Sequence, residues 1–309
     1  MNELTILIIF NILVVLMLAL DLGVFQRKAH FPSTKEALAW SIVWVVLSLQ
    51  FNLFIWYELG SVKALEFLTG YVIEKALSVD NIFVFIVIFS YFSVAQEYQH
   101  KVLFWGVLGA VVMRAVFIVV GAALVAKFHW ILYVFGVFLI YTAIKLAVQK
   151  DEAIEPERNP FLRFCRKLFP VSENYEGPKF FVRRNGRSFA TPLFLVLVVV
   201  ESTDVVFATD SIPAIFAITQ DPVIVYTSNI CAVLGLRALY FVLAGFMKRF
   251  RYLKNGLAIV LGFIGVKMLV EPLYKIPIEY SLAVIACILT VAVAVSLLPG
   301  DKQTDQRKP

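Results

Sequence analysis

Long apolar runs recur along the whole chain and constrain its fold more than any other feature. Each is about 20 residues or longer, the length that an α-helix needs to cross a hydrocarbon core of ~30 Å. Of the 309 residues, 61% are hydrophobic, whereas soluble domains have roughly 45–50%. A β-barrel would instead show alternating segments of about ten residues. We therefore predict an all-α, polytopic membrane protein, a single membrane domain over 1–309, with nine transmembrane helices near 4–25, 37–57, 65–93, 101–126, 129–148, 190–219, 223–248, 254–271 and 277–298.

Lysine and arginine residues are distributed unevenly between the two sides of these spans. If the N-terminus lies outside and the spans alternate, 21 of these cations fall on the inner side and 3 on the outer side. The positive-inside rule therefore predicts an external N-terminus and a cytoplasmic C-terminal tail, 299–309. No basic leader or small-residue cleavage site precedes the first span, so we expect it to be retained and not removed as a signal peptide. The net charge of +6 gives no sign of nucleic-acid binding.

One long loop, 149–189, is predicted on the cytoplasmic side. Asn159 and Pro160 are the residue types of a helix N-cap and a first helical position, and the stretch that follows combines an apolar face with three cations. This pattern favours a short helix on the inner leaflet, and the pair Asn185-Gly186 favours a hairpin. The alternative is a charged linker without fixed structure. Nothing in the loop indicates catalysis.

The third to fifth spans resemble the sixth to eighth in the same order, with one ionisable position per span in register. Each unit has three spans, so the two units must enter the membrane with opposite polarity. This is the inverted-topology repeat of secondary transporters, whose site lies at the repeat interface near the midplane. The alternative is a duplication kept only for packing. The units cover 65–148 and 190–271, and the matched pairs are Asp80 with Asp204, Arg114 with Arg237, and Lys145 with Lys267.

Five acids lie inside the third and sixth spans, where a charged carboxylate costs about 2.5–3.5 kcal/mol. Such a cost favours a site whose occupant offsets it, and a cation is the first candidate. The available ligands are carboxylate, amide and hydroxyl oxygens, with no His, Met or Cys in either acidic segment. Oxygen ligands suit Mg²⁺, Ca²⁺ or Mn²⁺ and do not select among them. The predicted metal site consists of Glu74, Asp80, Asn81, Glu201, Asp204 and Asp210.

Helix geometry decides which of these acids can meet. Glu201 and Asp204 share a face, whereas Asp210 lies about 180° from Glu201 on an ideal helix. Pro213 removes a backbone donor and clashes with the preceding turn. We therefore predict a break around 209–211 that swings Asp210 inward and frees carbonyl oxygens as additional ligands, as in the broken helices of transporters.

Two arginines inside spans, Arg114 and Arg237, are predicted to face the bundle and to support the acids as charge partners. The alternative is that they are packing counterions only. Neutralising two acids leaves up to three carboxylates close together, and these cannot all stay ionised in an empty site. Either a divalent cation or protons must then occupy the site. That competition is a physical basis for metal–proton exchange.

The acidic spans and the span after them contain the strings GYVIEKALSVDNIFVF, VESTDVVFATDSIPAIFAIT and SNICAVLGLRALYF. These strings resemble the TerC family of integral membrane proteins, and the resemblance covers nearly the whole chain. Within that family the chain is most similar to the Alx-type branch. The resemblance implies a bacterial inner-membrane protein that exports Mn²⁺ and is linked to alkaline pH. It also carries the family's acidic positions over to the five acids of the predicted metal site.

Three functions are therefore considered. The first is export of Mn²⁺ by proton exchange, with the ion as transported substrate, no prosthetic group, and the bilayer and protons as the other partners. The second is transport of another hard divalent cation, such as Ca²⁺. The third is a membrane assembly or tellurium-resistance-type stress scaffold whose acids are structural. The chain has no nucleophile–base pair, zinc triad or phosphate loop, so we expect no enzyme. Cys165, Cys231 and Cys287 are scattered and do not have the spacing of metal ligands or of disulfide partners.

Overall fold

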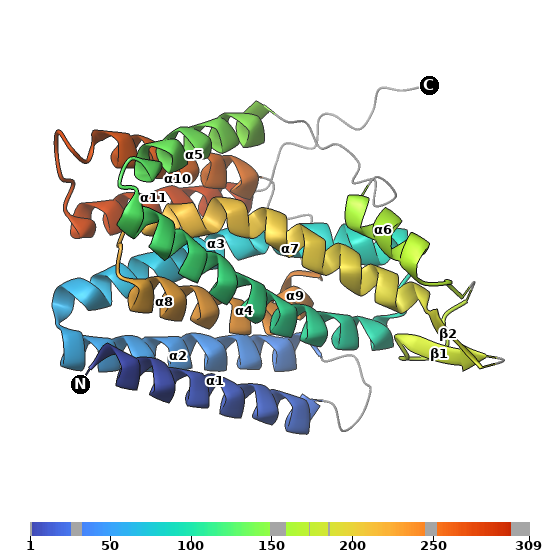
Figure 1. Ribbon diagram of the computed structural model, residues 1–309. Coiled ribbons are helices and arrows are strands. Elements are labelled where there is room, and N and C mark those ends of the chain that lie inside the picture. Colours follow the sequence, from blue (N-terminus) through green and yellow to red (C-terminus); the bar gives the residue numbers. More distant parts are fainter. Residues whose placement is uncertain are drawn as a thin grey trace.

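The protein is a bundle of long helices that run mostly along one direction, with a small helix and a β-hairpin at one end (Figure 1). The computed structural model describes residues 2–25, 33–148, 159–172, 174–184, 186–244 and 252–297. The predicted tail, 299–309, and the first part of the long loop, 149–158, lie outside these ranges. In chain order the elements are α1 (Glu3–Phe25), α2 (Thr34–Leu59), α3 (Ser61–Tyr91), α4 (Gln96–Lys127), α5 (Ile131–Val148), α6 (Pro160–Leu168), β1 (Phe181–Arg184), β2 (Arg187–Ala190), α7 (Pro192–Phe216), α8 (Pro222–Leu234), α9 (Leu236–Ala244), α10 (Leu253–Val270) and α11 (Ile278–Leu297).

Helices occupy every range that the sequence predicts to be a span. Among the described residues, 7 helical segments are long and apolar enough to cross a membrane, with α8 and α9 counted together. α3 is not among them because Glu74, Lys75 and Asp80 lie near its middle. The described apolar part of α1, Glu3–Ala19, is shorter than the others. The all-α polytopic membrane fold is confirmed, whereas the number of nine spans stays a prediction.

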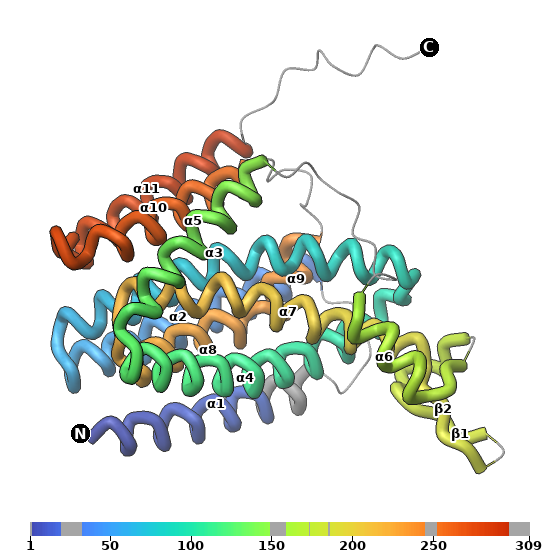
Figure 2. Tube along the Cα trace, turned by 45° about the horizontal axis from the view of Figure 1, so that its top comes forward, coloured from blue at the N-terminus to red at the C-terminus, as the bar shows by residue number. Residues whose placement is uncertain are grey.

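Four helices, α3, α4, α7 and α8, form the centre of the bundle. α1 and α2 lie on one side of this centre, and α5, α10 and α11 lie on the other (Figures 1 and 2). In the most apolar 18-residue stretch of the span formed by α8 and α9, 83% of the residues are buried, against 17% in the corresponding stretches of α5 and of α11. α5 and α11 therefore leave most of their residues unburied, which is the surface expected of helices that contact lipid.

Contacts between the central helices define two parallel pairs. α3 packs against α8, and α4 packs against α7. Each pair is parallel, because residues later in one helix contact residues later in the other. Small residues at these contacts let the backbones approach closely, as is common between membrane helices. The defining contacts are Gly70 with Ser228 and Lys75 with Ala232 for the first pair, and Gly106 with Val200 and Gly121 with Phe216 for the second.

α5 and α10 pack against each other in the antiparallel sense. Gly136 lies against Gly265, and Ala143, further along α5, lies against Gly262, further back along α10. A Cβ on Gly265 would lie 2.8 Å from the carbonyl oxygen of Gly136. Only glycine permits so close an approach of two backbones, so this crossing depends on the residue type.

The predicted break around 209–211 is wrong, because α7 is continuous through Pro213 to Phe216. Pro213 lies in the last turn, where it removes the hydrogen bond to the carbonyl oxygen of Thr209. The helix nevertheless continues to Phe216, and a 3.1 Å hydrogen bond runs from Ala217 N to Pro213 O. The interruption lies in the next predicted span instead, at Gly235 between α8 and α9. A Cβ there would lie 2.7 Å from Nζ of Lys75, so the glycine leaves room for that ammonium group.

The predicted helix and hairpin of the long loop are both present. Oδ1 of Asn159 accepts hydrogen bonds from the main-chain N–H groups of Phe161 and Leu162, at 2.9 and 3.2 Å, and so caps α6. β1 and β2 pair antiparallel with Arg184 opposite Arg187. These described parts of the loop therefore have a defined structure at one end of the bundle.

Candidate functional site

A buried arginine joins the four central helices. Arg114 on α4 is bidentate to Asp204 on α7, since Nε donates to Oδ2 at 3.1 Å and Nη2 donates to Oδ1 at 2.9 Å. Its Nη1 donates to Oε1 of Glu74 on α3, and to Oδ1 of Asn229 on α8 at 3.2 Å. Nδ2 of Asn229 donates to Oε2 of Glu74 at 2.8 Å and closes the network. We call these four residues the central network.

The central network is shielded from the surroundings. Glu74, Arg114 and Asn229 are 0% exposed, and Asp204 is 5% exposed. Buried charges persist only when they are paired and hydrogen-bonded, and a bidentate arginine–carboxylate pair is one of the stronger arrangements. When all three ionisable groups are charged, two carboxylates face one guanidinium. The excess negative charge suits an additional proton or cation.

Other buried polar groups lie on the same helices. The hydroxyl group of Ser78 and Nδ2 of Asn81 have no hydrogen-bond partner within the described part of the chain, whereas Ser211 lies close enough to Glu74 to interact with it. Ser78 and Asn81 are at most 1% exposed. An unsatisfied buried polar group costs about 1–3 kcal/mol. These groups are therefore able to hold water or a ligand without first breaking another hydrogen bond.

Glu201 faces the same neighbouring helix as Asp204, as their spacing predicts. Asp204 reaches Arg114 on α4, while the carboxylate of Glu201 lies against Gly109 on α4. A Cβ at Gly109 would lie 2.0 Å from Oε1 of Glu201. This glycine therefore makes the space that Glu201 occupies, about one turn before the central network.

Asp210 faces in another direction. Oγ1 of Thr142 on α5 donates a hydrogen bond to Oδ1 of Asp210 at 3.0 Å, and Lys145 of α5 is close enough to act on it electrostatically. Because α7 is not broken, this carboxylate stays on the α5 side of the helix and does not join Arg114. Asp80 is half-buried on α3, and Arg237 is buried on α9 with 5% exposure.

The structure thus brings some of the predicted site residues together and separates others. Glu74, Arg114 and Asp204 meet directly, whereas Glu201 and Asp210 lie against other groups. Within the ranges that the structure describes, no cluster of three or more His, Cys, Asp or Glu side chains is arranged to hold a metal ion. The six-residue metal site stays a prediction. Asn229 was not predicted, although an amide eight residues before Arg237 in an apolar span is a visible signal.

A second polar cluster, which the sequence did not single out, lies at the end of the bundle opposite the hairpin (Figure 1). Nζ of Lys63 is 3.0 Å from Oε2 of Glu66 and 3.0 Å from Oδ2 of Asp221. Oγ1 of Thr219 donates to Oε2 of Glu66 at 2.6 Å. An open pocket is lined by these residues and by Glu3 and Glu271. The charged side chains that line this pocket are therefore acidic, apart from Lys63.

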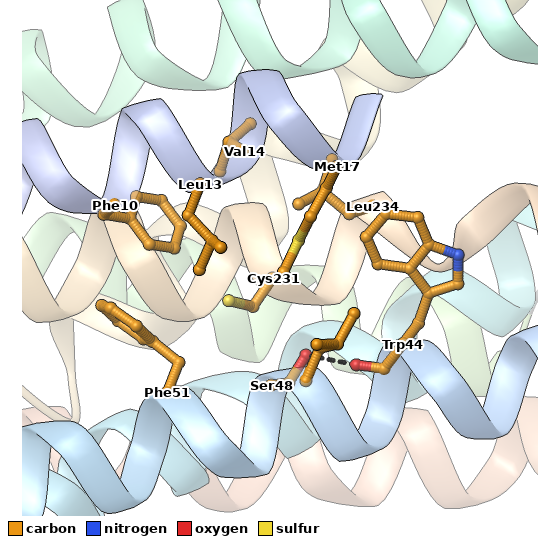
Figure 3. Close-up of a pocket in the computed structure, with 10 residues that line it drawn as sticks. Phe10, Leu13, Val14, Met17, Trp44, Ser48, Phe51, Cys231 and Leu234 are labelled. Carbon is orange, nitrogen blue, oxygen red and sulfur yellow. Dashed lines mark hydrogen bonds between the residues drawn. The ribbon is translucent and has the colours of Figure 1, made fainter. Parts of the chain in front are cut away.

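An apolar pocket lies between α1, α2 and α8 (Figure 3). The hydroxyl of Ser48 is a polar group in its lining and donates to the carbonyl oxygen of Trp44 at 2.8 Å. Side chains such as Phe10, Met17 and Phe51 form much of the rest. The pocket has no acidic lining residue, so it is unsuited to a hard cation.

A family model described as "Integral membrane protein TerC family" matches residues 59–304 of this chain. The chain belongs to the TerC family. The match includes the central network and both acidic spans, so the family's sequence pattern covers the part of the fold in which the buried charges lie. A multi-pass integral membrane protein follows from this match and from the helical bundle together.

Similar proteins extend over almost the full chain. An uncharacterized membrane protein of Myxococcus xanthus is 52% identical over 289 residues, which cover 94% of this chain and 91% of that protein. A protein of Salmonella typhi named "putative membrane-bound redox modulator Alx" is 49% identical and covers 93% of this chain and 92% of its own. The protein of the same name from Escherichia coli K12 is 48% identical, with 96% of each chain covered. No solved structure matches this TerC protein.

Proposed function

We propose that the protein is a transporter that exports Mn²⁺ from the cytoplasm across the bacterial inner membrane in exchange for protons. The observation that carries this proposal is the pair of buried carboxylates, Glu74 and Asp204, bridged by one arginine between four helices. Hard oxygen ligands and one uncompensated negative charge suit a hard divalent cation or protons. The choice of Mn²⁺ comes from the family resemblance and not from the ligands.

The helix directions support an inverted repeat as the frame of this transporter. Exchange of the two units, α3 to α5 and α7 to α10, converts the parallel pair α3–α8 into the parallel pair α7–α4. It converts the antiparallel pair α5–α10 into itself. Units of three spans with opposite polarity produce this pattern, and transporters built in this way bind substrate between the units. The central network lies at that place.

Arg114 gives the site a second state in this mechanism. Its guanidinium occupies the space between Glu74 and Asp204, so a cation that binds both carboxylates has to displace it. Protonation of one carboxylate weakens the hold on Arg114 and offers the same release without metal. The network would couple Mn²⁺ flux to proton flux because the arginine, a proton and the metal ion bind in turn to the same pair of acids.

The charges at the two ends support the proposed orientation. The cations of α6 and the hairpin, such as Arg163, Lys167 and Arg183, outnumber the three lysines of the opposite end, Lys63, Lys127 and Lys275. By the positive-inside rule the first end is cytoplasmic and the second is external. The N-terminus then lies outside, and the acidic pocket faces the compartment into which the metal is released.

Flux in proteoliposomes tests the proposal. We expect Asp204→Asn to reduce Mn²⁺ flux and the accompanying pH change more than tenfold, while Glu279→Gln, an exposed acid in the first turn of α11, behaves like wild type. Asp204→Asn also removes a partner of Arg114, so Glu201→Gln serves as a second variant outside the central network. Equal Mn²⁺ flux in all four proteins at equal incorporation would refute transport at these acids.

The same assay separates the other two functions. Flux of Ca²⁺ without flux of Mn²⁺ would indicate a transporter of another hard divalent cation. If neither ion moves and neutral variants instead change the assembly of other membrane proteins, the acids belong to a scaffold. In both cases the helical frame stays the same, and only the role of the acids changes.

The redox activity in the names of the relatives is not part of this proposal. Cys165, Cys231 and Cys287 lie in α6, α8 and α11, and all three are free thiols. Burial raises the pKa of the Cys165 thiol, and a raised pKa lowers the fraction of reactive thiolate. A variant with alanine at all three positions is expected to keep wild-type Mn²⁺ flux.

A further inference from the structure

α6 is attached along α7 at two points (Figure 1). At its first turn, Nδ2 of Asn159 donates to Oγ of Ser202 at 2.7 Å. Just after its last turn, the ring of Phe169 lies 6.1 Å from the ring of Phe194. Leu162 between these points is fully buried. α6 therefore runs antiparallel to the first half of α7 and lies against it.

The attachment places α6 near the boundary between headgroups and hydrocarbon. α7 has 25 residues, which span ~37 Å at 1.5 Å per residue and exceed a ~30 Å hydrocarbon core. Ser202 lies ten residues beyond Pro192, which is ~15 Å along the helix. If the excess length of α7 protrudes at this end, the first turn of α6 lies ~8 Å below the surface of the hydrocarbon. Phe169, next to Phe194 near the start of α7, then lies at the level of the headgroups, so α6 crosses the boundary.

α6 has three distinct faces. Leu162 faces α7, while the spacing of Phe161, Phe164 and Leu168 places them on a neighbouring face. These three side chains are 55%, 62% and 55% exposed. Arg163, Arg166 and Lys167 lie on the remaining face. Apolar and cationic faces side by side on one short helix are the pattern of a helix that binds an anionic membrane surface.

The hairpin extends this surface. The ring of Phe181 on β1 is 4.5 Å from that of Phe194 and 5.9 Å from that of Phe169, yet the side chain is 46% exposed. Arg183 and Arg187 are exposed on the two strands. By the strand register, Arg183 shares a face of the hairpin with Phe181, whereas Arg187 lies opposite Arg184 on the other face. Phe181 and Arg183 therefore continue the apolar and cationic faces of α6.

The surface is held to the bundle and is not free to move away from it. The hydroxyl of Tyr175 donates to the carbonyl oxygen of Phe92 at the end of α3 at 2.6 Å. Nζ of Lys101 on α4 donates to the carbonyl oxygen of Pro178 at 2.5 Å. The cations thus have fixed positions relative to the membrane-spanning helices, which a mobile linker would not provide.

We propose that α6 and the hairpin form a docking surface for anionic phospholipids of the leaflet that they face. The exposed phenylalanines lie among acyl chains, and the lysine and arginines contact phosphate groups, which attract such cation clusters next to a membrane span. Charge complementarity decides the occupant, because a zwitterionic leaflet offers no net charge to these cations. The proposal does not depend on what the bundle transports.

Lipid retention tests the proposal. The protein is reconstituted in nanodiscs of phosphatidylcholine with and without phosphatidylglycerol, and bound lipids are counted by native mass spectrometry after extraction. We expect wild type to retain phosphatidylglycerol preferentially and Lys167→Gln/Arg183→Gln, which removes two exposed cations of the surface, to retain several-fold less of it. The matched control, Lys127→Gln/Lys275→Gln, removes two exposed cations elsewhere on the protein and should behave like wild type.

A second measurement keeps the proposal falsifiable if retention is weak. Phosphatidylglycerol should raise the melting temperature of wild type above its value in phosphatidylcholine, and Phe161→Ser/Phe164→Ser should lose that increment. Equal retention and equal melting increments in the surface and control variants would overturn the proposal. So would protection by soluble inorganic phosphate equal to that by the lipid, because the surface would then be a phosphate site and not a lipid site.

Discussion

The central network and the α6–hairpin surface hold charged side chains in opposite environments, one buried and one exposed. In the centre, Arg114 makes hydrogen bonds to three side chains from three other helices. At the surface, Arg183 and Arg187 are exposed and project from short strands. Burial explains the difference, because a charge inside the bundle must be matched by partners, while a charge at the boundary is solvated by water and lipid phosphate. Substitutions should therefore have unequal consequences in the two regions.

Removal of the central cation should have the largest effect. Arg114→Gln leaves Glu74 and Asp204 buried without their charge partner, and breaking a buried ion pair costs about 3–5 kcal/mol. We expect a large drop in melting temperature in detergent, with Arg187→Gln as the surface control. A fall no larger than that of the control would show that the central network does not stabilise the fold.

Filling the space beside Glu201 should have the next largest effect. Gly109→Ala places a Cβ within 2.0 Å of Oε1 of Glu201, and overpacking of this kind costs about 1–3 kcal/mol. The side chain of Glu201 can move, so we expect a moderate loss of stability and a larger loss of Mn²⁺ flux. The double variant Gly109→Ala/Glu201→Ala should regain stability but not Mn²⁺ flux. If it does not regain stability, the loss in Gly109→Ala does not come from a clash with Glu201.

The acid that faces α5 should matter less than the acids of the centre. Asp210→Asn and Thr142→Val each disturb one hydrogen bond at a half-buried site, which costs about 0.5–1.5 kcal/mol. Because the two side chains share that bond, the double variant should lose less than the sum of the two single losses. Additive losses in thermal unfolding would show that the bond between them contributes nothing.

An exposed ion pair on the hairpin should have the smallest effect. Arg184 pairs with Glu176 and is 60% exposed, and exposed pairs contribute about 0.2–1 kcal/mol. Arg184→Gln should therefore unfold within a degree or two of its neighbour variant Arg183→Gln. A loss as large as that of Arg114→Gln would remove the contrast between the two regions.

The sequence predicted the elements of this protein well because their causes are local. Apolar runs of sufficient length predict membrane helices, and Asn159 followed by Pro160 predicts the start of α6. The predicted break at Pro213 failed because a proline removes only one helical hydrogen bond, and residues 211–216 around it are buried in the bundle and stay helical. The interruption at Gly235 was missed because it accommodates Lys75 from another helix, a contact that no local pattern contains.

By itself, the sequence determined that the chain is a polytopic helical membrane protein of the TerC family with acids and arginines inside its spans. Only the tertiary structure decided which of these charges meet. Spacing places Glu201 and Asp204 on one face of a helix, but the helix opposite that face depends on packing across the bundle. Arg114 therefore found its partners in α3, α7 and α8, while Asp210 bonded to α5. Side-chain pairing between helices is a property of their close approach, which the glycines permit and the linear order of residues does not reveal.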